Sequence, residues 1–254
     1  MRQFDGLAPT VCLVVPCYNE ARRLDLPNFQ KFFAAHERVR VVFVDDGSRD
    51  NTLTVLQQLC AGFEDRTLAL PLERNRGKAE AVRTGVQHSL AHFQPGIVGY
   101  WDADLATPLT ALDDFLAVFD RAPEVLMVFG ARVKLLGRHV ERRAMRHYLG
   151  RVFATVVSTM LRLAIYDTQC GAKLFRVDDA AREAFAEPFI SKWVFDVEIL
   201  ARYLKYFGHD TSKLARAVYE YPLREWVDIA GSKVRAGDFV KAFLDVVRIK
   251  RKYL

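Results

Sequence analysis

The sequence predicts an α/β protein in which a mostly parallel sheet is covered by helices on both faces. Short β-branched or aromatic runs alternate with helical patterns through the first half of the chain. Strands that alternate with helices form parallel sheets, because each helix carries the chain back across the sheet. The composition is globular, with 51% apolar and 27% charged residues, and 254 residues suffice for one large core. We therefore expect a single domain over residues 1–254.

Five runs have the composition of buried strands, since they are short, apolar and rich in β-branched or aromatic residues. They are Val11–Val15, Val41–Val44, Thr67–Leu70, Ile97–Trp101 and Val125–Phe129. Helical spacing of apolar residues predicts helices between them, at Leu26–His36, Asp50–Leu59, Lys78–Phe93 and Leu109–Asp120. Asp50 is expected to be an N-cap, because its carboxylate can accept from the first free backbone N–H groups.

The second half has a different character, and we place an internal boundary near Lys134, between halves 10–134 and 135–254. Glu141–Arg162 begins basic and becomes apolar, and Asp196–Tyr206 is a shorter helical pattern. Ala236–Lys252 is amphipathic. Its expected apolar face is Phe239, Val240, Phe243, Val246, Val247 and Tyr253, and its basic residues are Lys241, Arg248, Lys250, Arg251 and Lys252.

Charge and targeting features narrow the class of protein. The net charge of +6 favours anionic partners such as phosphates, nucleic acid or an anionic lipid surface. Nucleic acid is disfavoured, because no recognisable reading motif accompanies the basic residues. The run Val152–Ile165 is too short to span a bilayer, and MRQFDGLAPT has no apolar signal region. With four cysteines and no C-x-x-C spacing, we expect a cytoplasmic protein that is not secreted.

Three polar clusters follow predicted strands, at the edge where parallel sheets bind their ligands. They are Pro16–Glu20, Asp45–Ser48 and Asp102–Asp104, and Asn75–Lys78 lies at the same edge as a fourth. Asp102 and Asp104 leave the fourth strand at positions i and i+2, and both can reach one hard cation such as Mg²⁺. A solvated turn or helix cap is the alternative for a D-x-D sequence by itself. Two other polar strand ends beside it favour the metal interpretation.

The other clusters favour a nucleotide and its phosphates. Asp45-Asp46-Gly47-Ser48 is either a turn or a carboxylate site for a base or ribose. Asn75-Arg76-Gly77-Lys78 opens a helix, whose N-terminus attracts anions. The first strand is followed by no G-x-G-x-x-G sequence and the chain has no Walker A sequence, which disfavours dinucleotide enzymes and NTPases.

These elements in this order resemble the family 2 glycosyltransferases, whose fold is the Rossmann-like GT-A fold. The matching segments are Val14–Glu20, Val44–Ser48, Asn75–Lys78 with Ala81, and Asp102–Asp104. The resemblance implies a nucleotide-sugar-binding first half and an acceptor-side second half. It places Pro16, Tyr18, Glu20 and Asp46 at the nucleotide, and Asp102 and Asp104 at a Mg²⁺ or Mn²⁺ ion and the diphosphate.

The second half looks like that of dolichyl-phosphate β-glucosyltransferases. The matching segments are Asp167–Phe175, Trp193–Glu198, Trp226 and Gly231-Ser232-Lys233, together with Asp102–Pro108 in the first half. The resemblance implies a UDP-sugar donor, with glucose expected, and a polyprenyl or dolichyl phosphate acceptor. On the acceptor side we expect Gln169, Lys173, Trp193, Glu198 and Trp226.

The mechanism expected is one displacement that inverts the anomeric centre. Lys78 and Arg132 would add positive charge at the donor phosphates. A phosphate acceptor is already anionic and needs cations, for which Lys173, Lys233 and the arginines around Arg142–Arg146 are candidates. A hydroxyl acceptor needs a general base, for which Asp196 is the first candidate and Glu198 the second. Asp196 is equally well interpreted as a helix N-cap.

Three functions therefore stay open. The first is a polyprenyl-phosphate glycosyltransferase bound peripherally at the inner face of a membrane, with the basic helices on anionic headgroups. The second is a soluble family 2 glycosyltransferase acting on a hydroxyl of a glycan, protein or small molecule. The third is a nucleotide-binding protein without turnover, which the intact Asp102 and Asp104 disfavour.

Overall fold

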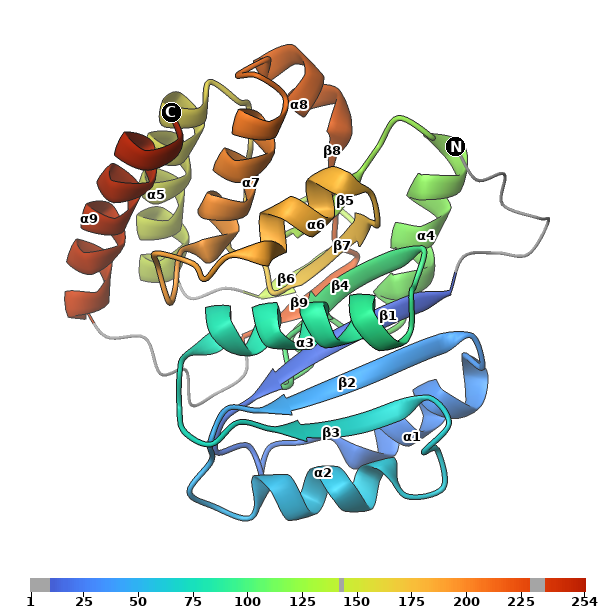
Figure 1. Ribbon diagram of the computed structural model, residues 1–254. Coiled ribbons are helices and arrows are strands. Elements are labelled where there is room, and N and C mark those ends of the chain that lie inside the picture. Colours follow the sequence, from blue (N-terminus) through green and yellow to red (C-terminus); the bar gives the residue numbers. More distant parts are fainter. Residues whose placement is uncertain (1–9, 142–143, 229–235) are drawn as a thin grey trace.

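One seven-stranded sheet forms the centre of the computed structural model, which describes residues 10–141, 144–228 and 236–254 (Figure 1). Its strands are β1 (Val11–Cys17), β2 (Val39–Asp45), β3 (Thr67–Pro71), β4 (Ile97–Trp101), β5 (Met127–Ala131), β7 (Ala172–Arg176) and β8 (Val218–Pro222). Their order is β3-β2-β1-β4-β7-β5-β8. All neighbours are parallel except that β7 is antiparallel to both β4 and β5. The predicted mostly parallel α/β fold is confirmed.

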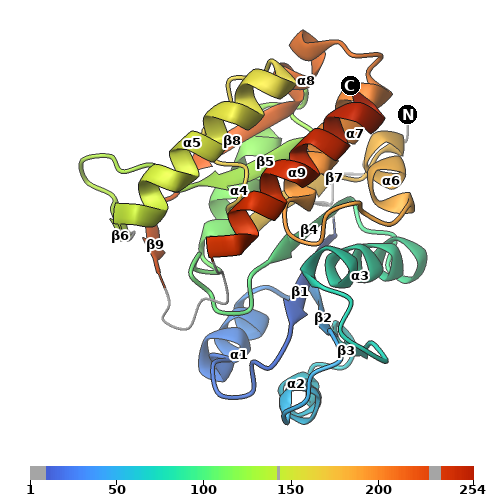
Figure 2. The same ribbon diagram turned by 90° about the vertical axis from the view of Figure 1, so that its left-hand side faces the viewer.

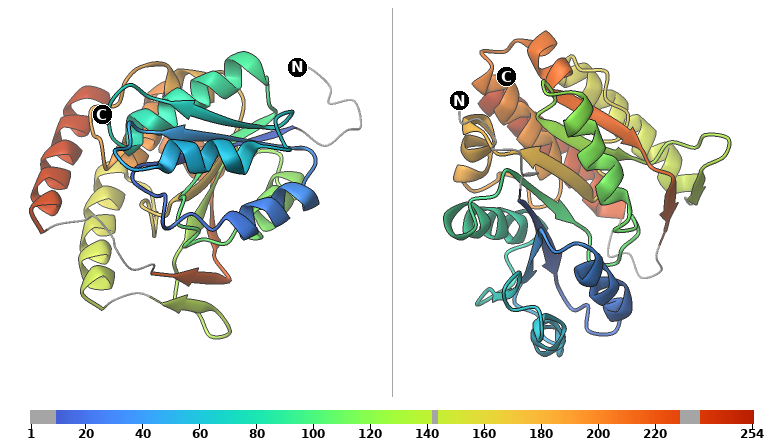
Figure 3. Two further views of the ribbon diagram at one scale, coloured as in Figure 1. Left: turned by 90° about the horizontal axis from the view of Figure 1, so that it is seen from below. Right: turned by 90° about the vertical axis from the view of Figure 1, so that its right-hand side faces the viewer.

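Helices cover both faces of the sheet, as the two views of Figure 3 show. The helices α1 (Leu26–Ala35), α2 (Thr52–Cys60) and α4 (Ala111–Arg121) contribute to one core. The helices α3 (Lys78–His92), α5 (Ala144–Leu161), α6 (Asp179–Ala186), α7 (Phe195–Tyr206), α8 (Thr211–Ala217) and α9 (Ala236–Tyr253) contribute to the other. A short parallel pair, β6 (His139–Glu141) and β9 (Glu225–Val227), lies apart from the main sheet.

The central strands are apolar throughout because both of their faces are buried. Successive side chains of a strand point to opposite faces. In β2, Val41 and Phe43 accordingly join the core with α1 and α2, whereas Val42 joins the core with α3. Helix α3 lies close to the sheet at Gly85, where an added Cβ would be 2.4 Å from a methyl group of Val14. A glycine at this position therefore sets how closely α3 packs on β1.

The elements predicted in the first half are all present, and no end differs by more than two residues. One capping prediction is wrong. Helix α2 begins at Thr52 with Asn51 in the cap position, and Asp50 instead accepts from the Thr52 backbone N–H at 3.0 Å. The carboxylate still satisfies the first turn of the helix, from one position earlier than expected.

The predicted apolar face of the last helix is also corrected. Among the α9 side chains that the structure describes, the buried ones are Ala242, Val246, Ile249 and Tyr253, which recur at helical spacing and face the core that includes α7. Phe243 and Val247, which were expected on the same face, are 37% and 46% exposed. The side chains of Phe239 and Val240 lie outside the described residues. Helix α9 thus has a buried face and a second, exposed apolar face.

The second half of the chain completes the sheet of the first half. Strand β7 inserts between β4 and β5, with Trp101 opposite Ala172, and β8 adds the outer edge beside β5. Because β7 runs against its neighbours, the loop that precedes it lies at the edge where β1, β2 and β4 end. That loop carries residues 162–171 to the polar clusters of the first half.

Candidate active site

The carboxyl ends of β1, β2 and β4 meet at one edge of the sheet, as predicted for parallel strands. The loops after β1 and β2 are bonded together there. The Asn19 backbone N–H donates to Ser48 Oγ at 2.9 Å, and the Arg49 N–H donates to Asn19 Oδ1 at 2.9 Å. Asn19 has a left-handed φ of 52°, which asparagine tolerates better than most residues. The segments that contain Tyr18 and Asp46 are therefore held side by side.

Asp46 is buried and holds the loop that leads into α3. Its two carboxylate oxygens accept from the backbone N–H groups of Arg76, at 2.7 Å, and Gly77, at 2.8 Å. Gly77 has a φ of +95°, a conformation that favours glycine. Burial raises the pKa of Asp46 above its ordinary value, although these two hydrogen bonds act in the opposite direction. Asp46 therefore fixes the segment Asn75–Lys78 relative to the end of β2.

Arg23 links Glu20 to Asp104, one of the two carboxylates after β4. The guanidinium of Arg23 is 3.3 Å from Glu20 Oε2 and 3.4 Å from Asp104 Oδ2. The Glu20 backbone N–H donates to Thr52 Oγ1 at 2.8 Å. Arg23 was not among the sequence candidates, and its position in a loop with no strand pattern gave no signal for this role.

Asp102 and Asp104 form the acidic group after β4. Lys78 Nζ is 2.5 Å from Asp102 Oδ1, and Asp104 Oδ1 accepts from the Ala106 N–H at 3.2 Å. Gly171 lies directly against Asp102, because an added Cβ would be 1.8 Å from Asp102 Oδ2. Burial, and then the neighbouring Asp102, raise the pKa of Asp104 above its ordinary value. A carboxyl pKa raised by burial and by a second carboxylate is typical of functional sites.

These residues fit a divalent cation whose remaining ligands come from elsewhere. Within the described parts of the chain, no group of three or more His, Cys, Asp or Glu side chains is placed to hold a metal ion. Mg²⁺-type ions are commonly held by one or two carboxylates together with substrate phosphates and water. Asp102 and Asp104 supply hard oxygen donors of this kind. Burial and the nearby Asp102 raise the pKa of Asp104, and a bound cation would offset both effects.

Asp196 is a buried partner of Lys173 and is not a helix cap. It lies in the first turn of α7, where Val194 occupies the cap position. Asp196 Oδ1 is 2.5 Å from Lys173 Nζ and also accepts from the Tyr100 hydroxyl. Lys173 is fully buried and donates to the Cys170 carbonyl at 2.5 Å. The cap interpretation is therefore wrong, and the carboxylate serves a buried charge.

The positive charge of Lys78 connects the two acidic groups. Asp102, and more weakly Asp196 and Asp104, raise the pKa of Lys78 above its ordinary value against the opposing effect of desolvation. Lys78 is about one third exposed, at 36% of its side chain, so it faces the open side of the site. An ammonium in this position is available to phosphate oxygens.

Glu198 lies on the other side of α7 and is fully buried. It accepts from the Ile190 N–H at 2.8 Å, from Arg202 Nη2 at 2.8 Å and from the Tyr253 hydroxyl at 2.9 Å. These contacts join α7 to the preceding loop and to the end of α9. In this arrangement Glu198 holds the helices together and is unsuited to proton transfer. Trp193, which was predicted beside it, is partly buried against the same core.

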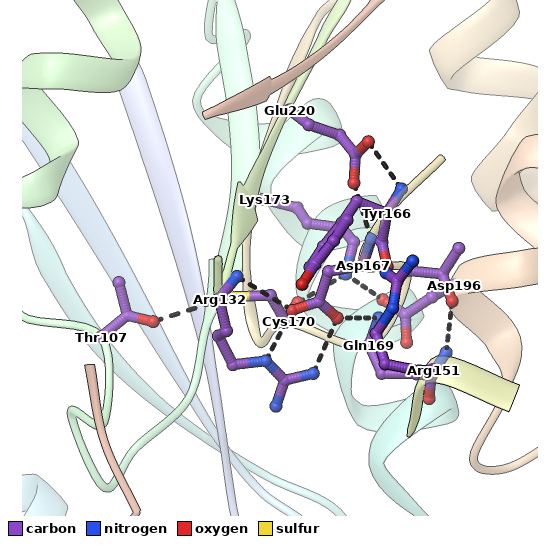
Figure 4. Close-up of polar contacts among 11 residues, drawn as sticks. Thr107, Arg132, Arg151, Tyr166, Asp167, Gln169, Cys170, Lys173, Asp196 and Glu220 are labelled. Carbon is purple, nitrogen blue, oxygen red and sulfur yellow. Dashed lines mark hydrogen bonds and ion pairs between the residues drawn. The ribbon is translucent and has the colours of Figure 1, made fainter. Parts of the chain in front are cut away.

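Arg132 and Asp167 form an ion pair between the first and second halves of the chain, shown in Figure 4. Arg132 Nε and Nη2 donate to the two Asp167 oxygens at 2.6 and 2.7 Å, a bidentate geometry. The Arg132 guanidinium lies 5.2 Å from the Trp226 ring centroid. Asp167 and, further away, Asp102 raise the pKa of Arg132, which is charged at any ordinary pH. The Gln169 backbone N–H donates to Asp167 Oδ1 at 3.1 Å.

Several sequence candidates lie outside these contacts. Lys233 and the arginines 142 and 143 are outside the described residues, as is the side chain of Arg146. Pro16 lies near the end of β1 and Tyr18 directly follows that strand, at the same edge of the sheet. Both residues are partly buried. The structure thus brings Lys78, Asp102, Asp104, Lys173 and Asp196 into one region, with Asp46 behind the loop before α3 and Arg132 on the β5 side.

Comparison with known proteins agrees with this geometry. The sequence profile described as Glycosyl transferase family 2 matches residues 12–182, which is most of the chain. The chain belongs to this family. It is therefore a glycosyltransferase that uses a nucleotide sugar, and the resemblance found in the sequence is confirmed.

Its relatives in sequence match nearly all of the chain. It is 31% identical to the mouse dolichyl-phosphate β-glucosyltransferase over 270 residues, covering 99% of this chain and 78% of the mouse protein. It is 30% identical to the Dictyostelium discoideum protein of the same name over 257 residues, covering 95% and 74% of the two chains.

Solved structures share the GT-A fold. Glucosyl-3-phosphoglycerate synthase from Mycobacterium tuberculosis, solved with Mn²⁺, UDP-glucose and phosphoglyceric acid, has a TM-score of 0.69 at 15% identity, covering 96% of this chain and 80% of that one. A mannosyltransferase from Pyrobaculum calidifontis, solved with GDP-mannose and Mn²⁺, has a TM-score of 0.58 at 19% identity. This chain covers 64% of the mannosyltransferase and 96% of itself in that match.

Proposed function

We propose that this glycosyltransferase moves glucose from UDP-glucose to a polyprenyl phosphate of the dolichyl type, with inversion at the anomeric carbon. The donor half would be residues 10–134 and the acceptor half residues 135–254. The similarity to dolichyl-phosphate β-glucosyltransferases over nearly the whole chain supports the choice of sugar and lipid.

The structural observation that carries the acceptor class is the state of Asp196. A hydroxyl acceptor needs a general base with a free lone pair near the reacting oxygen. Asp196 is buried and its Oδ1 accepts from both Lys173 and Tyr100. Glu198 accepts from backbone N–H groups, Arg202 and Tyr253. An acceptor phosphate carries its negative charge already, because its second pKa is about 6. Such an acceptor needs cations rather than a base.

In the reaction proposed, an oxygen of the acceptor phosphate forms a bond to C1 of glucose while the bond from C1 to the diphosphate breaks. UDP leaves with the bonding electron pair, and no proton has to move. Lys78 and the N-terminus of α3 would stabilise the negative charge that develops on the diphosphate. Asp102 and Asp104 would hold Mg²⁺ or Mn²⁺, which supplies further charge neutralisation at the leaving group when it is bound.

A lipid acceptor requires the site to approach a membrane, and we infer that an anionic lipid surface is the partner of one face of the molecule. Within the described residues no helix is both long and apolar enough to cross a bilayer. Helices α5 and α9 lie side by side on the face seen in Figure 2, with the Phe153 and Phe243 rings 5.9 Å apart. Exposed apolar residues gather on these helices and on the loop before β6: Leu135, Leu136, Val152, Val156, Phe243, Leu244 and Val247.

Basic residues accompany this apolar face, which matches an anionic bilayer in charge. Lys250, Arg251 and Lys252 form the last turn of α9. Each Lys or Arg near an anionic surface contributes about 1 kcal/mol of attraction. Exposed apolar side chains beside such charges are typical of helices that lie in a membrane interface. We propose accordingly that the protein binds peripherally to the inner, cytoplasmic face of a membrane.

The function is tested by incubating the purified protein with UDP-glucose, a polyprenyl phosphate and Mg²⁺ or Mn²⁺ in detergent. We expect release of UDP and formation of a glucosyl phosphate lipid. UDP-galactose, UDP-N-acetylglucosamine and GDP-mannose are run in parallel to test the sugar. Transfer to free hydroxyl acceptors, with no lipid product, would establish the second function in place of the first.

A further inference from the structure

Arg132 carries a guanidinium whose orientation is set by the segment before β7. Its Nε and Nη2 atoms are bonded to Asp167, and its backbone N–H donates to the same carboxylate at 3.1 Å. Among the described residues, none accepts a hydrogen bond from Nη1. The side chains of Arg132 and Asp167 are 15% and 6% exposed, so the free edge of Arg132 has a defined direction. Asp102 lies close enough to contribute to the raised pKa of Arg132.

Glu220 fixes the position of Asp167 itself. Its Oε2 and Oε1 atoms accept from the backbone N–H groups of Tyr166 and Asp167, both at 2.7 Å. Glu220 lies on β8, opposite Phe129 of β5, and β5 leads directly into Arg132. One carboxylate therefore holds two successive peptide groups, as Figure 4 shows. Glu220 is partly buried, and removing a carboxylate from water costs free energy unless hydrogen bonds such as these compensate.

Arg151 of α5 holds the same peptide unit from the other side. Its Nη1 donates to the Tyr166 carbonyl at 3.1 Å, and its guanidinium lies 3.8 Å from the centroid of the Tyr166 ring. The segment then continues to Gly171, whose carbonyl accepts from the Asp102 N–H at 2.9 Å. A displacement of Tyr166 and Asp167 would thus move both the Arg132 guanidinium and the backbone beside Asp102.

We propose that Glu220 is a positioning residue that, through Asp167, aims the Arg132 guanidinium at a phosphate group of a substrate. This inference rests on the proposed function, because only phosphate-bearing substrates need such a cation. The phosphate belongs either to the lipid acceptor or to the donor diphosphate. Arg132 lies on the β5 side of β7, away from the loops after β1 and β2, which favours the acceptor.

The test is a double-variant cycle on Glu220 and Arg132, with kcat and KM measured separately for donor and acceptor. Glu220→Gln keeps the shape but places an amide N–H₂ against one of the two backbone N–H groups. We expect it to lower kcat/KM by about 10- to 100-fold, the loss typical of misplaced substrate groups. Arg132→Lys should lower it as well, because lysine cannot form the bidentate pair with Asp167.

The decisive result is the double variant. If Glu220 acts through Arg132, the double variant should be no worse than Arg132→Lys alone. Losses that multiply would overturn the proposal, since they would mean that Glu220 supports the fold independently. A raised KM for the lipid phosphate with unchanged UDP affinity identifies the acceptor, and the opposite pattern identifies the donor diphosphate.

Two further variants control for misfolding. Glu225→Gln makes the same change on exposed β9 and should retain wild-type kinetics. Arg151→Gln removes the contact on the Tyr166 carbonyl and leaves Glu220 intact. If Glu220→Gln does not fold, Arg151→Gln takes its place in the cycle with the same expectation. If the proposed function is wrong, the wild-type protein will make no glucosyl lipid. If this inference is wrong, the losses in kcat/KM of the two single variants will multiply in the double variant, with whichever acceptor is used.

Discussion

Lys78 Nζ lies 2.5 Å from Asp102 Oδ1, and this contact joins the first turn of α3 to the end of β4. The lysine is placed by Asp46, whose carboxylate binds the backbone just before it. The start of α3 thus contacts two carboxylates, Asp46 through backbone N–H groups and Asp102 through the Lys78 ammonium. A diphosphate entering this region would meet both positive charges, with the acidic pair behind them available to a divalent cation.

Asp104→Asn is expected to lower kcat by at least about 100-fold while leaving the fold intact, since the loss of one preorganised charge at a leaving group commonly costs this much. Asparagine can still accept from the Ala106 N–H, so the turn is retained. Turnover is measured as UDP release, and EDTA should cause the same loss in the wild type, reversed by added Mg²⁺ or Mn²⁺. Asp65→Asn is the matched control, because Asp65 is exposed on the surface. Near-native activity of Asp104→Asn with metal present would refute the metal assignment.

The same variant is expected to be more stable than the wild type without metal. Burial and Asp102 raise the pKa of Asp104, so the folded state binds its proton more tightly than the unfolded state does. Stability from this group therefore falls as pH rises from the ordinary carboxyl pKa through the raised one. At pH 7 in EDTA, Asp104→Asn should melt about 1–3 °C higher, the shift that a gain below about 1 kcal/mol gives in a chain of this size.

That gain should shrink as the pH falls toward 4, where the wild-type carboxyl becomes protonated too. Differential scanning calorimetry at several pH values measures it. A melting temperature difference that is constant with pH would show that Asp104 is not under electrostatic strain.

Asp46→Asn is expected to weaken UDP binding about tenfold, with a smaller effect on kcat. The amide can accept from only one of the Arg76 and Gly77 N–H groups and opposes the other, which releases the loop that carries Lys78. Isothermal titration calorimetry with UDP measures the affinity. Asp50→Asn, on a carboxylate that contacts α2 instead, is the control. An unchanged affinity in a folded variant would make Asp46 a turn residue without influence on the nucleotide.

Sequence reasoning could find the donor half because its chemistry follows strands that are recognisable alone. β4 ends at Trp101 and Asp102 comes next, so the position of the carboxylate follows from the strand. The contacts of Asp196 and Glu198 could not be found in the same way. The two residues are two positions apart in the first turn of α7, so they point to nearly opposite sides of the helix. Helical spacing predicts this separation, but it does not predict that one side meets Lys173 and the other meets Tyr253.

The antiparallel β7 was the larger omission. Its five residues, Ala172–Arg176, include the charged Lys173 and follow Cys170-Gly171. This stretch is therefore interpreted as part of a family motif, and its sequence does not predict a strand. Glu220 was missed because β8 shows no regular alternation, with only Tyr219 exposed among its five residues, and nothing in its sequence points to the Tyr166 and Asp167 backbone.

Lys173→Met tests whether the buried pair is structural. Removing one partner of a buried ion pair costs about 3–5 kcal/mol, because Asp196 is left charged and unpaired in the core. We expect a clear fall in melting temperature, and a partial recovery in the double variant with Asp196→Asn. Asp196→Asn alone should reduce turnover with a phosphate acceptor far less than the two to four orders of magnitude, roughly, that loss of a general base costs. A loss of that size with a proven phosphate acceptor would restore Asp196 as a base.

The last prediction concerns the face formed by α5, α9 and the loop before β6. Leu136, in the loop before β6, is fully exposed, and Leu244 and Val247 are 55% and 46% exposed. Apolar side chains grouped on a surface are unfavourable in water unless a partner covers them. We expect the protein to sediment with liposomes that contain anionic lipid, and the bound fraction to fall as salt rises. Salt screens the basic residues but not the apolar contacts, so some binding should persist at high salt.

Two double variants separate the electrostatic contribution to membrane binding from the apolar one. Lys250→Glu with Arg251→Glu should weaken binding mainly at low salt, and Leu135→Ser with Leu136→Ser should weaken it at every salt concentration. Lys31→Glu with Arg121→Glu makes the same charge change on α1 and α4, and should bind like the wild type. All three should retain UDP release in detergent, where no bilayer has to be bound. A wild-type protein that stays in the supernatant with anionic liposomes at low salt would remove the membrane surface as a partner and favour a soluble acceptor.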